Sequence, residues 1–368
     1  MLLGDVSKIK TGNLDVNAKV KNGRYPFFTC AQKPEKIDSY SFDCECVLVA
    51  GNGDLNIKYY EGKFDVYQRT YVVEVLKKGR LNTRFLFYFL KKYLDKLRSQ
   101  SIGGVIKYIK MANLTDIELP EYSLEKQKQI VQILDIADNL CQKRKKQIAL
   151  IDDYLKSVFL EMFGDPRVDS RWNLINFGEV IDILTDYHAN GSYEVLRKHV
   201  ELKSKHDYAL MVRTTDLENN NFTDNVKHIS KNAYNFLEKS KIYGGEIIIT
   251  KIGSAGNVYI MPNLNRPVSL GMNAFLLRFK KNTNNIFVYY LLTSDYGKYV
   301  IKSKIKGAVT KTIRKDAVRS LKIPLPSLEL QNKFASIVEQ VEKTKQKMRD
   351  SLNEMDNHFN ALMQKYFG

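Results

Sequence analysis

The chain contains an internal repeat, and this repeat limits what the chain can fold into more than any other feature. Residues 103–164 align with residues 307–368 at a constant offset of 204 without a gap, and 15 of the 62 pairs are identical. The fronts also match, since residues 3–6 align with residues 177–180 at an offset of 174, so the second copy holds 204 − 174 = 30 additional residues. A tandem duplication with similar ends and divergent middles predicts a shared scaffold whose middle segments bind different things.

The back of each copy has the pattern of a long helix in a coiled coil. Ten positions spaced alternately by four and three residues, starting at Ile130 and at Phe334, are apolar in nine cases in each copy. Apolar residues that recur every 3.5 positions over such a length are typical of a coiled-coil seam. The exceptions, Arg144 and Lys345, are interpreted as residues that fix the register or extend toward solvent. The residues expected to pack in the seam are Ile130, Leu134, Ile148, Ile151, Leu155, Phe334, Val338, Met348, Leu352 and Phe359.

Both helices carry sequence signals for their ends. Ser123 and Ser327 are the predicted N-caps, and Gly164 and Gly368 are predicted to end the helices. A helix of about 40 residues is roughly 60 Å long, and we expect the two to pack antiparallel with one globular unit at each end of the pair. The expected globular domains are residues 1–122 and 177–326, the helices are residues 123–164 and 327–368, and residues 165–176 form the linker.

The front of each copy is predicted to be an α/β (α+β) module built around a glycine-rich turn. The chain as a whole is therefore expected to be a tandem repeat of two such globular domains joined by the helix pair. Glycines in the turns would let the backbone approach another surface closely. Predicted strands are residues 46–50 and 71–75 in the first copy and 246–250, 258–260 and 274–279 in the second, and the predicted short helices are residues 84–93 and 287–292.

The charge balance favours nucleic acid as the partner. The chain has 58 Lys and Arg against 41 Asp and Glu, a formal net charge of +17. Basic side chains gathered on a face release condensed counterions when they meet a phosphate backbone. A solvated basic surface without a partner is the alternative, and composition does not decide between the two.

Signatures of common enzymes, metal sites and membrane segments are missing from the sequence. It has no phosphate-binding P-loop, no H-E-x-x-H motif and no pair of adjacent prolines as in the adenine-methyltransferase tetrapeptide. Four cysteines without C-x-x-C units, and five histidines outside ligand spacing, predict no metal site. Asp54 with Glu61 and Lys63 matches a nuclease pattern only loosely, and a surface hairpin is the preferred interpretation. The absence of a long apolar run and of a signal-peptide pattern predicts a cytoplasmic protein without membrane association.

The join between the front and the back of the second copy resembles a known family. Residues 323–329 read Ile-Pro-Leu-Pro-Ser-Leu-Glu and are followed by Gln331, after a Gly-Ala-Val loop at residues 307–309. Together with two divergent α/β units alternating with two similar helices, this resembles the specificity subunit of type I restriction-modification systems over nearly the whole chain. The first copy departs from the pattern, since Glu121 and Tyr122 replace the second proline.

The resemblance implies a division of labour between this chain and its partners. Each globular target-recognition domain would read one half of a split site in double-stranded DNA, and the helices would hold the halves at a fixed separation. The helices would also dock two methyltransferase subunits, through which restriction (motor-nuclease) subunits join. S-adenosylmethionine, ATP and magnesium would belong to these partners, and this chain would be a non-catalytic DNA reader without a cofactor of its own.

Candidate DNA-binding residues lie beside the glycine-rich turns. Basic residues at matching positions of both copies cannot encode different bases, so they are the better candidates for phosphate contacts. For any single one of these residues, an ordinary solvated side chain is the competing interpretation. The candidates for base reading are Asn52, Gln68, Arg69, Arg213, Lys251, Ser254, Asn257 and Asn273, and those for phosphate contacts are Lys107, Lys110, Lys311 and Arg314.

Three other functions are compatible with the sequence. The chain could be a stand-alone DNA-modifying enzyme with an unfamiliar motif, which would act on DNA without partners. It could be a scaffold or RNA-binding coiled-coil protein, which would select no two-part DNA motif. The third is a specificity subunit of a related restriction class, which would serve a fused nuclease-methyltransferase. This third function is a variant of the type I specificity subunit.

Overall fold

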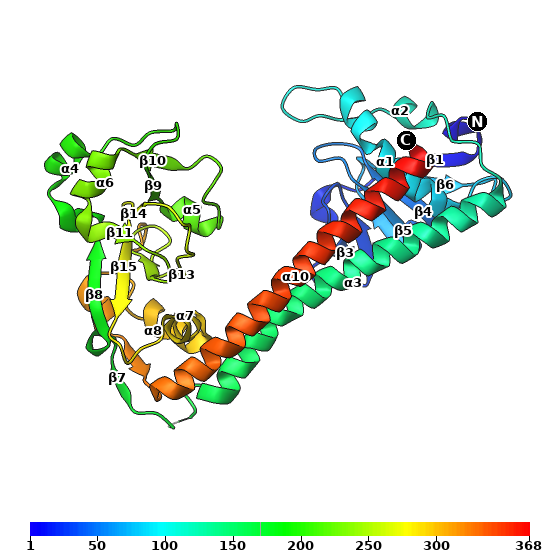
Figure 1. Cartoon of the computed structure of the whole chain (residues 1–368). Helices are drawn as coiled ribbons and strands as arrows, with labels where there is room; N and C mark the ends of the chain where they lie inside the picture. The colour runs from blue at the N-terminus through cyan, green and yellow to red at the C-terminus, as the bar shows by residue number, and fades with distance from the viewer. Residues whose placement is uncertain (170) are drawn as a thin grey trace. The chain divides into compact units, whose positions relative to one another are not determined.

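The computed structural model describes residues 1–169 and 171–368 and divides into two units (Figure 1). Unit 1 comprises Met1–Gln147 and Met348–Gly368, and unit 2 comprises Ile148–Lys347. Both divisions fall inside long helices, so each unit contains one half of the helix pair and one globular part. The tandem α/β architecture with two long helices is confirmed.

The globular part of unit 1 is built on one six-stranded sheet with the order β1-β6-β4-β5-β2-β3. All neighbours are antiparallel except β2 and β5. The sheet is covered on both faces, because Val47 and Val49 pack with the residues of α1 while Cys46 and Leu48 pack with Phe64 on the other side. The strands are β1 (Ser7–Thr11), β2 (Tyr25–Phe28), β3 (Glu35–Ile37), β4 (Phe42–Ala50), β5 (Ile57–Val66) and β6 (Thr70–Val75), and the helices are α1 (Thr83–Gln100), α2 (Ala112–Thr115) and the 3-10 turns η1 (Leu3–Asp5) and η2 (Val16–Ala18).

Strand β5 was not expected from the sequence. The surface hairpin preferred for Asp54 with Glu61 and Lys63 is nevertheless confirmed, because β4 and β5 are consecutive antiparallel strands and both Glu61 and Lys63 are exposed on β5. The strands and the helix expected at 46–50, 71–75 and 84–93 are present within β4, β6 and α1.

Unit 2 carries two four-stranded sheets in place of one. The order β13-β12-β15-β8 repeats the core of unit 1, since β8, β15 and β12 pair as β1, β6 and β4 do. The second sheet, β10-β9-β14-β11, lies in the longer front part of the second copy, and there β9 and β14 are parallel. The expected strands at 246–250, 258–260 and 274–279 and the helix at 287–292 correspond to β12, β13, β15 and α7.

The remaining element bounds of unit 2 complete the description. The strands are β7 (Leu174–Asn176), β8 (Ile181–Asp186), β9 (Ala209–Val212), β10 (Lys227–Ile229), β11 (Lys241–Ile242), β12 (Ile247–Thr250), β13 (Val258–Ile260), β14 (Val268–Leu270), β15 (Ala274–Phe279) and β16 (Lys322–Pro324). The helices are α4 (Tyr193–His199), α5 (Thr214–Glu218), α6 (Lys231–Phe236), α7 (Asn285–Thr293), α8 (Asp295–Lys302) and α9 (Lys315–Arg319), with 3-10 turns η3 (Phe177–Glu179), η4 (Tyr187–Asn190) and η5 (Glu238–Ser240).

The two long helices are α3 (Leu124–Phe163) and α10 (Leu328–Phe367), each of 40 residues, and they pack antiparallel (Figure 1). Ser123 Oγ accepts a hydrogen bond from the amide of Lys126 at 3.2 Å, and Ser327 Oγ accepts one from Leu330 at 3.3 Å, as expected for N-caps. Gly164 has the left-handed φ of 73° that ends α3.

The expected seam residues are all buried or half-buried in the unit to which they belong. Ile130, Leu134, Leu352 and Phe359 join the core of unit 1, and Leu155, Phe334 and Val338 join the core of unit 2. Ile148, Ile151 and Met348 are half-buried.

The two exceptions in the seam behave differently. The side chain of Lys345 is only 8% exposed, and its ammonium group binds Asp152 on the other helix. Arg144 is half-buried and donates to Gln147 Oε1 at 3.2 Å on its own helix. Lys345 also lies 3.8 Å from Glu342 on its own helix, so only its pairing with Asp152 favours one register of the two helices.

A buried glutamine ties each long helix to the globular part of its unit. Gln127 Oε1 accepts from the amide of Asn82, the residue that caps α1, at 2.9 Å. In unit 2, Gln331 Oε1 accepts from the amide of Asn284, which caps α7, also at 2.9 Å. The side-chain amides of both glutamines donate to two backbone carbonyls each. The repeated Gln of the sequence therefore joins the long helix to the globular part of each unit.

Replacing this glutamine should destabilise the fold. Gln331→Leu keeps the volume but leaves the Asn284 amide and the carbonyls of Asn282 and Pro326 without partners, at a cost of roughly 2–4 kcal/mol. Urea denaturation followed by circular dichroism should show a lower midpoint. The matched control Gln340→Leu, at an exposed position of the same helix, should change the midpoint little. Equal midpoints for the two variants would contradict the role of Gln331.

Candidate nucleic-acid interface

Backbone hydrogen bonds gather three loops at one edge of the sheet in unit 1. The amide of Gly51 donates to Arg69 O at 2.8 Å, and the amide of Gly53 donates to Lys107 O at 2.9 Å. The amide of Ile109 closes the set by donating to Gly51 O at 2.9 Å. The predicted residues Asn52, Gln68, Arg69, Lys107 and Lys110 are therefore brought together at this three-loop junction, although 58 residues of sequence separate the first from the last.

The same junction recurs in unit 2 with different side chains. The amide of Lys251 donates to Asn273 O at 2.8 Å, the amide of Gly253 to Lys311 O at 3.1 Å, and the amide of Ile313 to Lys251 O at 3.0 Å. These bonds correspond one by one to those of unit 1. At one matching position the units differ, with Arg69 in unit 1 and Asn273 in unit 2. At another they carry the same residue type, Lys107 and Lys311.

Glycine is required at the start of the third loop in both copies. Gly103 and Gly307 have φ values of 113° and 102°. A Cβ atom at Gly307 would stand 2.1 Å from Thr310 O, and one at Gly103 would stand 2.5 Å from Ile106 O. Both the backbone conformation and the lack of room explain why this residue is the same in the two copies.

Most of the predicted residues offer their side chains to solvent. Asn52 and Ser254 are half-buried, and the hydroxyl of Thr250 donates to the backbone carbonyl of Ser254, which holds that turn in place. The exposed ones are Gln68, Arg69, Lys107, Lys110, Asn257, Asn273, Lys311 and Arg314.

Two valines at the tips of the third loops were missed by the sequence analysis. Val105 and Val309 are fully exposed, at 103% and 98% of the reference area. Because the two copies of the repeat differ at most positions, an exposed valine that is identical in both is a candidate for contact with a ligand or partner. The signal was available, because Val105 and Val309 are among the identical positions of the repeat.

Lys251 conflicts with the expectation that it reads bases. Its ammonium group is 2.8 Å from Asp186 Oδ2, and its side chain is only 13% exposed. Lys315 approaches the other oxygen of Asp186 at 3.2 Å. These three residues form an internal charge cluster beneath the junction, so Lys251 is part of the scaffold that positions the loops.

Arg213 is also partly committed inside unit 2. Its guanidinium donates to Asp216 Oδ1 at 2.6 Å and to the backbone carbonyl of Asn225 at 2.8 Å, and about a third of the side chain stays exposed. With Met272 and Asn273 it lines a cavity of 280 Å³ at the junction. Arg213 can therefore present one edge of its guanidinium to a ligand while its position is fixed by Asp216.

The charge cluster has no counterpart in unit 1. Strand pairing places Thr11 opposite Tyr71 as Asp186 lies opposite Phe275, and the repeat places Met111 where Lys315 stands. Burial alone would raise the pKa of Asp186, but the ammonium groups of Lys251 and Lys315 outweigh it and hold the pKa below its ordinary value. Asp186 is therefore ionised at neutral pH and stabilises both lysines.

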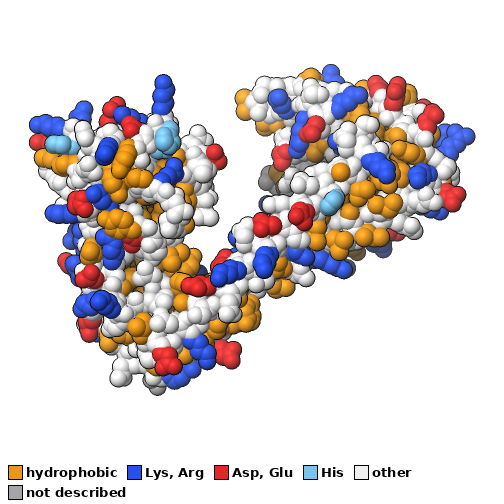
Figure 2. Space-filling model, viewed as in Figure 1, with side chains coloured by type: hydrophobic (Ala, Val, Ile, Leu, Met, Phe, Trp, Pro, Cys, Tyr) orange, Lys and Arg blue, Asp and Glu red, His pale blue; other side chains and the backbone are white. Residues whose placement is uncertain are grey.

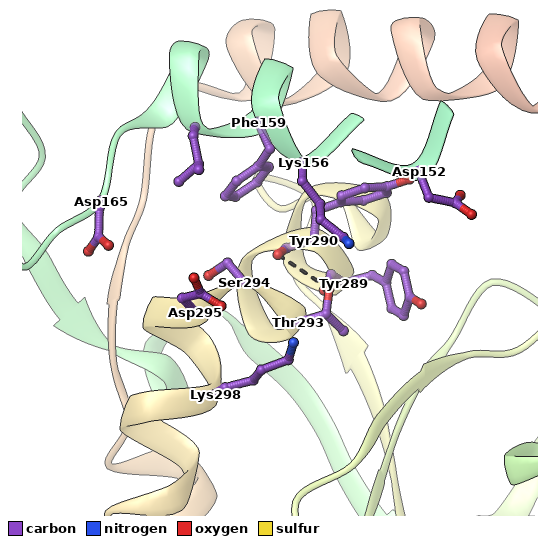
Figure 3. A pocket seen from close by; sticks show the side chains of 11 residues that line it. Asp152, Lys156, Phe159, Asp165, Tyr289, Tyr290, Thr293, Ser294, Asp295 and Lys298 are labelled. Carbon is purple, nitrogen blue, oxygen red and sulfur yellow. Dashed lines mark hydrogen bonds between the residues drawn. The ribbon is translucent and has the colours of Figure 1, made fainter. Parts of the chain in front are cut away.

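Another cavity of unit 2, of 570 Å³, lies between the end of α3 and the helices α7 and α8 (Figure 3). Tyr289, Tyr290 and Phe159 supply an aromatic wall, and Thr293 Oγ1 donates to Tyr289 O at 2.7 Å. Three carboxylates, those of Asp152, Asp165 and Asp295, stand against two lysines. None of the predicted DNA-binding residues lines this cavity, and its acidic character is unfavourable for a phosphate backbone.

Asp54, from the loose nuclease pattern, is engaged in unit 1. One of its carboxylate oxygens accepts from Gln32 at 3.1 Å and the other lies 3.5 Å from Arg98. Within residues 1–169 and 171–368, no group of three or more His, Cys, Asp or Glu side chains is arranged to hold a metal ion. Over the same residues, no helix combines the length and the apolar content that crossing a bilayer requires.

Comparison with known proteins defines the class to which this architecture belongs. The family model described as "Type I restriction modification DNA specificity domain" matches residues 1–150 and 170–356, and the chain belongs to this family. The chain is thus a type I restriction-modification specificity subunit, a DNA-recognition component of such systems.

Individual relatives span almost the whole chain. The EcoDI type I restriction enzyme specificity subunit of Escherichia coli is 25% identical over 406 aligned residues, covering 99% of this chain and 86% of the relative. The MjaVIII specificity subunit of Methanocaldococcus jannaschii is 25% identical and covers 83% of this chain and 77% of its own length. The crystal structure of the S subunit from M. genitalium has a TM-score of 0.58 at 18% identity and covers 100% of this chain and 95% of that one, so the fold is the same.

Removing the carboxylate of Asp186 should destabilise unit 2 in a pH-dependent way. Asp186→Asn leaves two lysines without their counter-charge, at a cost of roughly 2–4 kcal/mol near neutral pH. Because the folded-state pKa of Asp186 is lowered, its contribution is complete above the ordinary Asp pKa and is lost as the pH falls through the folded-state value. Urea midpoints measured from pH 6 to pH 3 should therefore converge for the two proteins.

The control is Lys315→Met, which introduces the residue found at the matching position of unit 1 and keeps the Lys251–Asp186 pair. It should cost less than about 1 kcal/mol. A difference between Asp186→Asn and the parent chain that persists unchanged at pH 3 would show that the ion pairs are not its cause.

Proposed function

We propose that each unit reads one half of a two-part DNA sequence through its three-loop junction. The observation that carries this proposal is the correspondence of the two junctions, which share backbone hydrogen bonds but differ in side chains. A common frame with unlike side chains is what two different half-sequences require. Basic side chains are spread over both units, with acidic ones among them (Figure 2), so contact with a phosphate backbone is compatible with either unit.

The side chains at each junction divide by their chemistry. Gln68 and Asn273 offer both a donor and an acceptor, which suits the edges of bases in the major groove. Arg69 adds a guanidinium, the side chain most often used for guanine. Lys107 and Lys311 occupy matching positions in both copies and are proposed to bind phosphates, which fix the position of the protein without reading sequence.

The helix pair is proposed to set the separation of the half-sequences and to dock the methyltransferase subunits. Each helix of 40 residues is roughly 60 Å long, enough to separate two reading sites by a turn of DNA or more. Helix α3 exposes large apolar side chains in both units, namely Ile133, Ile136 and Leu140 in unit 1 and Leu150 and Tyr154 in unit 2. Exposed apolar residues at helical spacing fit a protein partner.

The chemistry of modification and cleavage is assigned to partner subunits. We propose two methyltransferase subunits on the helices, with restriction subunits joined through them, in the cytoplasm. S-adenosylmethionine, ATP and magnesium would be bound there and not by this chain. The support is the sequence, which carries none of the motifs for those ligands, and the relatives, which are named as specificity subunits of restriction enzymes.

Lengthening α3 should lengthen the unread gap of the DNA site. Insertion of four residues after Gln142 adds about 6 Å, one helical turn, which corresponds to about one or two base pairs. Methylome sequencing of cells that express the variant with its methyltransferase subunit should show both half-sequences unchanged and the gap longer. The parent chain, tested in parallel, gives the reference motif. A methylated motif with an unchanged gap would refute the spacer role.

Removing a proposed phosphate contact should weaken binding to all sequences equally. Lys311→Ala should lower the affinity for cognate and non-cognate duplexes by the same factor and reduce the slope of log affinity against log salt by about 1. Fluorescence anisotropy over a salt series measures both quantities. Lys281→Ala, an exposed lysine outside the junction, is the matched control. A loss confined to one base pair of the site would instead make Lys311 a base-reading residue.

A further inference from the structure

Unit 2 contains a polar cavity beside the junction that the proposed function does not use. Its volume is 570 Å³. It shares Arg213 with the smaller cavity that Asn273 lines, so it adjoins the proposed reading surface. Its lining is polar or charged except for one valine: Ser204, His206, Arg213, Thr223, Asn225, Val226, Lys227, His228 and Arg266.

A buried imidazole in this cavity lacks a partner. His228 lies on β10, and its side chain belongs to a residue that is only 6% exposed. Both ring nitrogens are inaccessible to solvent, and neither makes a hydrogen bond within residues 1–169 and 171–368. The ring of His206 is 4.9 Å away, centre to centre. Buried polar groups are almost always paired, so an unpaired one that lines a cavity indicates a ligand.

The charge of the cavity is positive. Lys227 donates to Ser204 Oγ at 2.6 Å, and the guanidinium of Arg266 donates to Phe222 O. Among the described residues neither cation has a carboxylate within ion-pair distance. Two nearby carboxylates are already engaged, since Asp216 binds Arg213 and Asp207 binds Lys203 at 2.8 Å. Two uncompensated cations and two imidazoles are complementary to an anion.

We propose that this cavity binds a phosphate group, namely a backbone phosphate of the DNA next to the half-sequence read by unit 2. This inference rests on the proposed function and adds a contact that unit 1 does not share. The phosphate oxygens would accept from Lys227 and Arg266, and the imidazole of His228 would act on the phosphate through its charge from the cavity wall. Arg213 would link the bound phosphate to the loops that read bases. A free phosphate offers the same chemistry, and the experiment below separates the two sources.

Binding of this phosphate should depend on pH. Burial lowers the pKa of His228 below its ordinary value, and His206 and Arg266 lower it further, whereas Asp207 acts in the opposite direction. The imidazole is therefore neutral near pH 7 in the free protein, with Lys227 and Arg213 as the other charges lining the cavity. A bound phosphate favours the protonated ring, so binding takes up a proton and the affinity rises as the pH falls.

The test measures duplex binding by the full chain over a salt series and between about pH 8 and pH 6. Arg266→Gln and Lys227→Gln should each weaken binding about tenfold and reduce the salt slope by about 1, with the methylated motif unchanged. His228→Gln should flatten the pH dependence. Lys281→Gln, an exposed lysine outside the cavity, should leave affinity, slope and pH dependence as they are. Circular dichroism verifies that each variant is folded, and the two cation variants keep the test valid if His228→Gln does not fold.

Each outcome decides the matter. Unchanged duplex affinity in both folded cation variants overturns the proposal. If inorganic phosphate, titrated by calorimetry, binds the parent chain and not Arg266→Gln while duplex affinity stays equal, the cavity takes a free phosphate and the backbone assignment is wrong. Failure of the proposed function is distinguishable, because the parent chain would then yield no two-part methylated motif, whatever the cavity variants do.

Discussion

The buried glutamine at the start of each long helix is the contact on which the architecture depends. Gln127 and Gln331 each satisfy one backbone amide and two backbone carbonyls of the segments around them, and the amide belongs to the residue that caps α1 or α7. The direction in which the scaffold helix leaves the globular part is fixed by this side chain. Because the same joint occurs in both copies, the recognition domains can diverge in sequence while their attachment to the scaffold stays the same.

The side chains of the two units differ in the loops of the junction, which the buried glutamine does not contact. The three loops of each junction are held by backbone hydrogen bonds, which accept many side chains, so Arg69 and Asn273 can stand at one matching position without changing the frame. Unit 2 has a second sheet that unit 1 lacks. It also has an internal charge cluster of Asp186, Lys251 and Lys315, and the matching positions of unit 1 hold the uncharged residues Thr11, Gly51 and Met111. The two units therefore reach the same loop arrangement by different internal means: in unit 1 the Tyr71 hydroxyl donates to Ile109 O at 3.0 Å, whereas in unit 2 two lysines pair with Asp186.

The sequence was sufficient for the scaffold and insufficient for the site. The 3.5-residue period and the end signals predicted both long helices to within one residue at Ser123 and Gly164, because helix formation depends on local pattern. Strand β5 was not predicted as a separate strand, although the surface hairpin expected around Glu61 and Lys63 is present as the antiparallel pair of β4 and β5. The burial of Lys251 against Asp186 was not predictable, since the two residues are 65 apart in sequence and meet only in the folded domain. The cavity around His228 depends in the same way on contacts between distant segments.

The division of both helices between the units has a consequence for synthesis on the ribosome. Unit 2 is one continuous stretch, Ile148–Lys347, whereas unit 1 needs Met348–Gly368 to cover Phe85 and Tyr88 with Phe359 and Phe367. The first domain to be translated is therefore the last to be completed, and the apolar groove that α10 fills stays open while some two hundred residues emerge. During that interval, a nascent chain would depend on chaperones or on an early partner to keep the groove from aggregating.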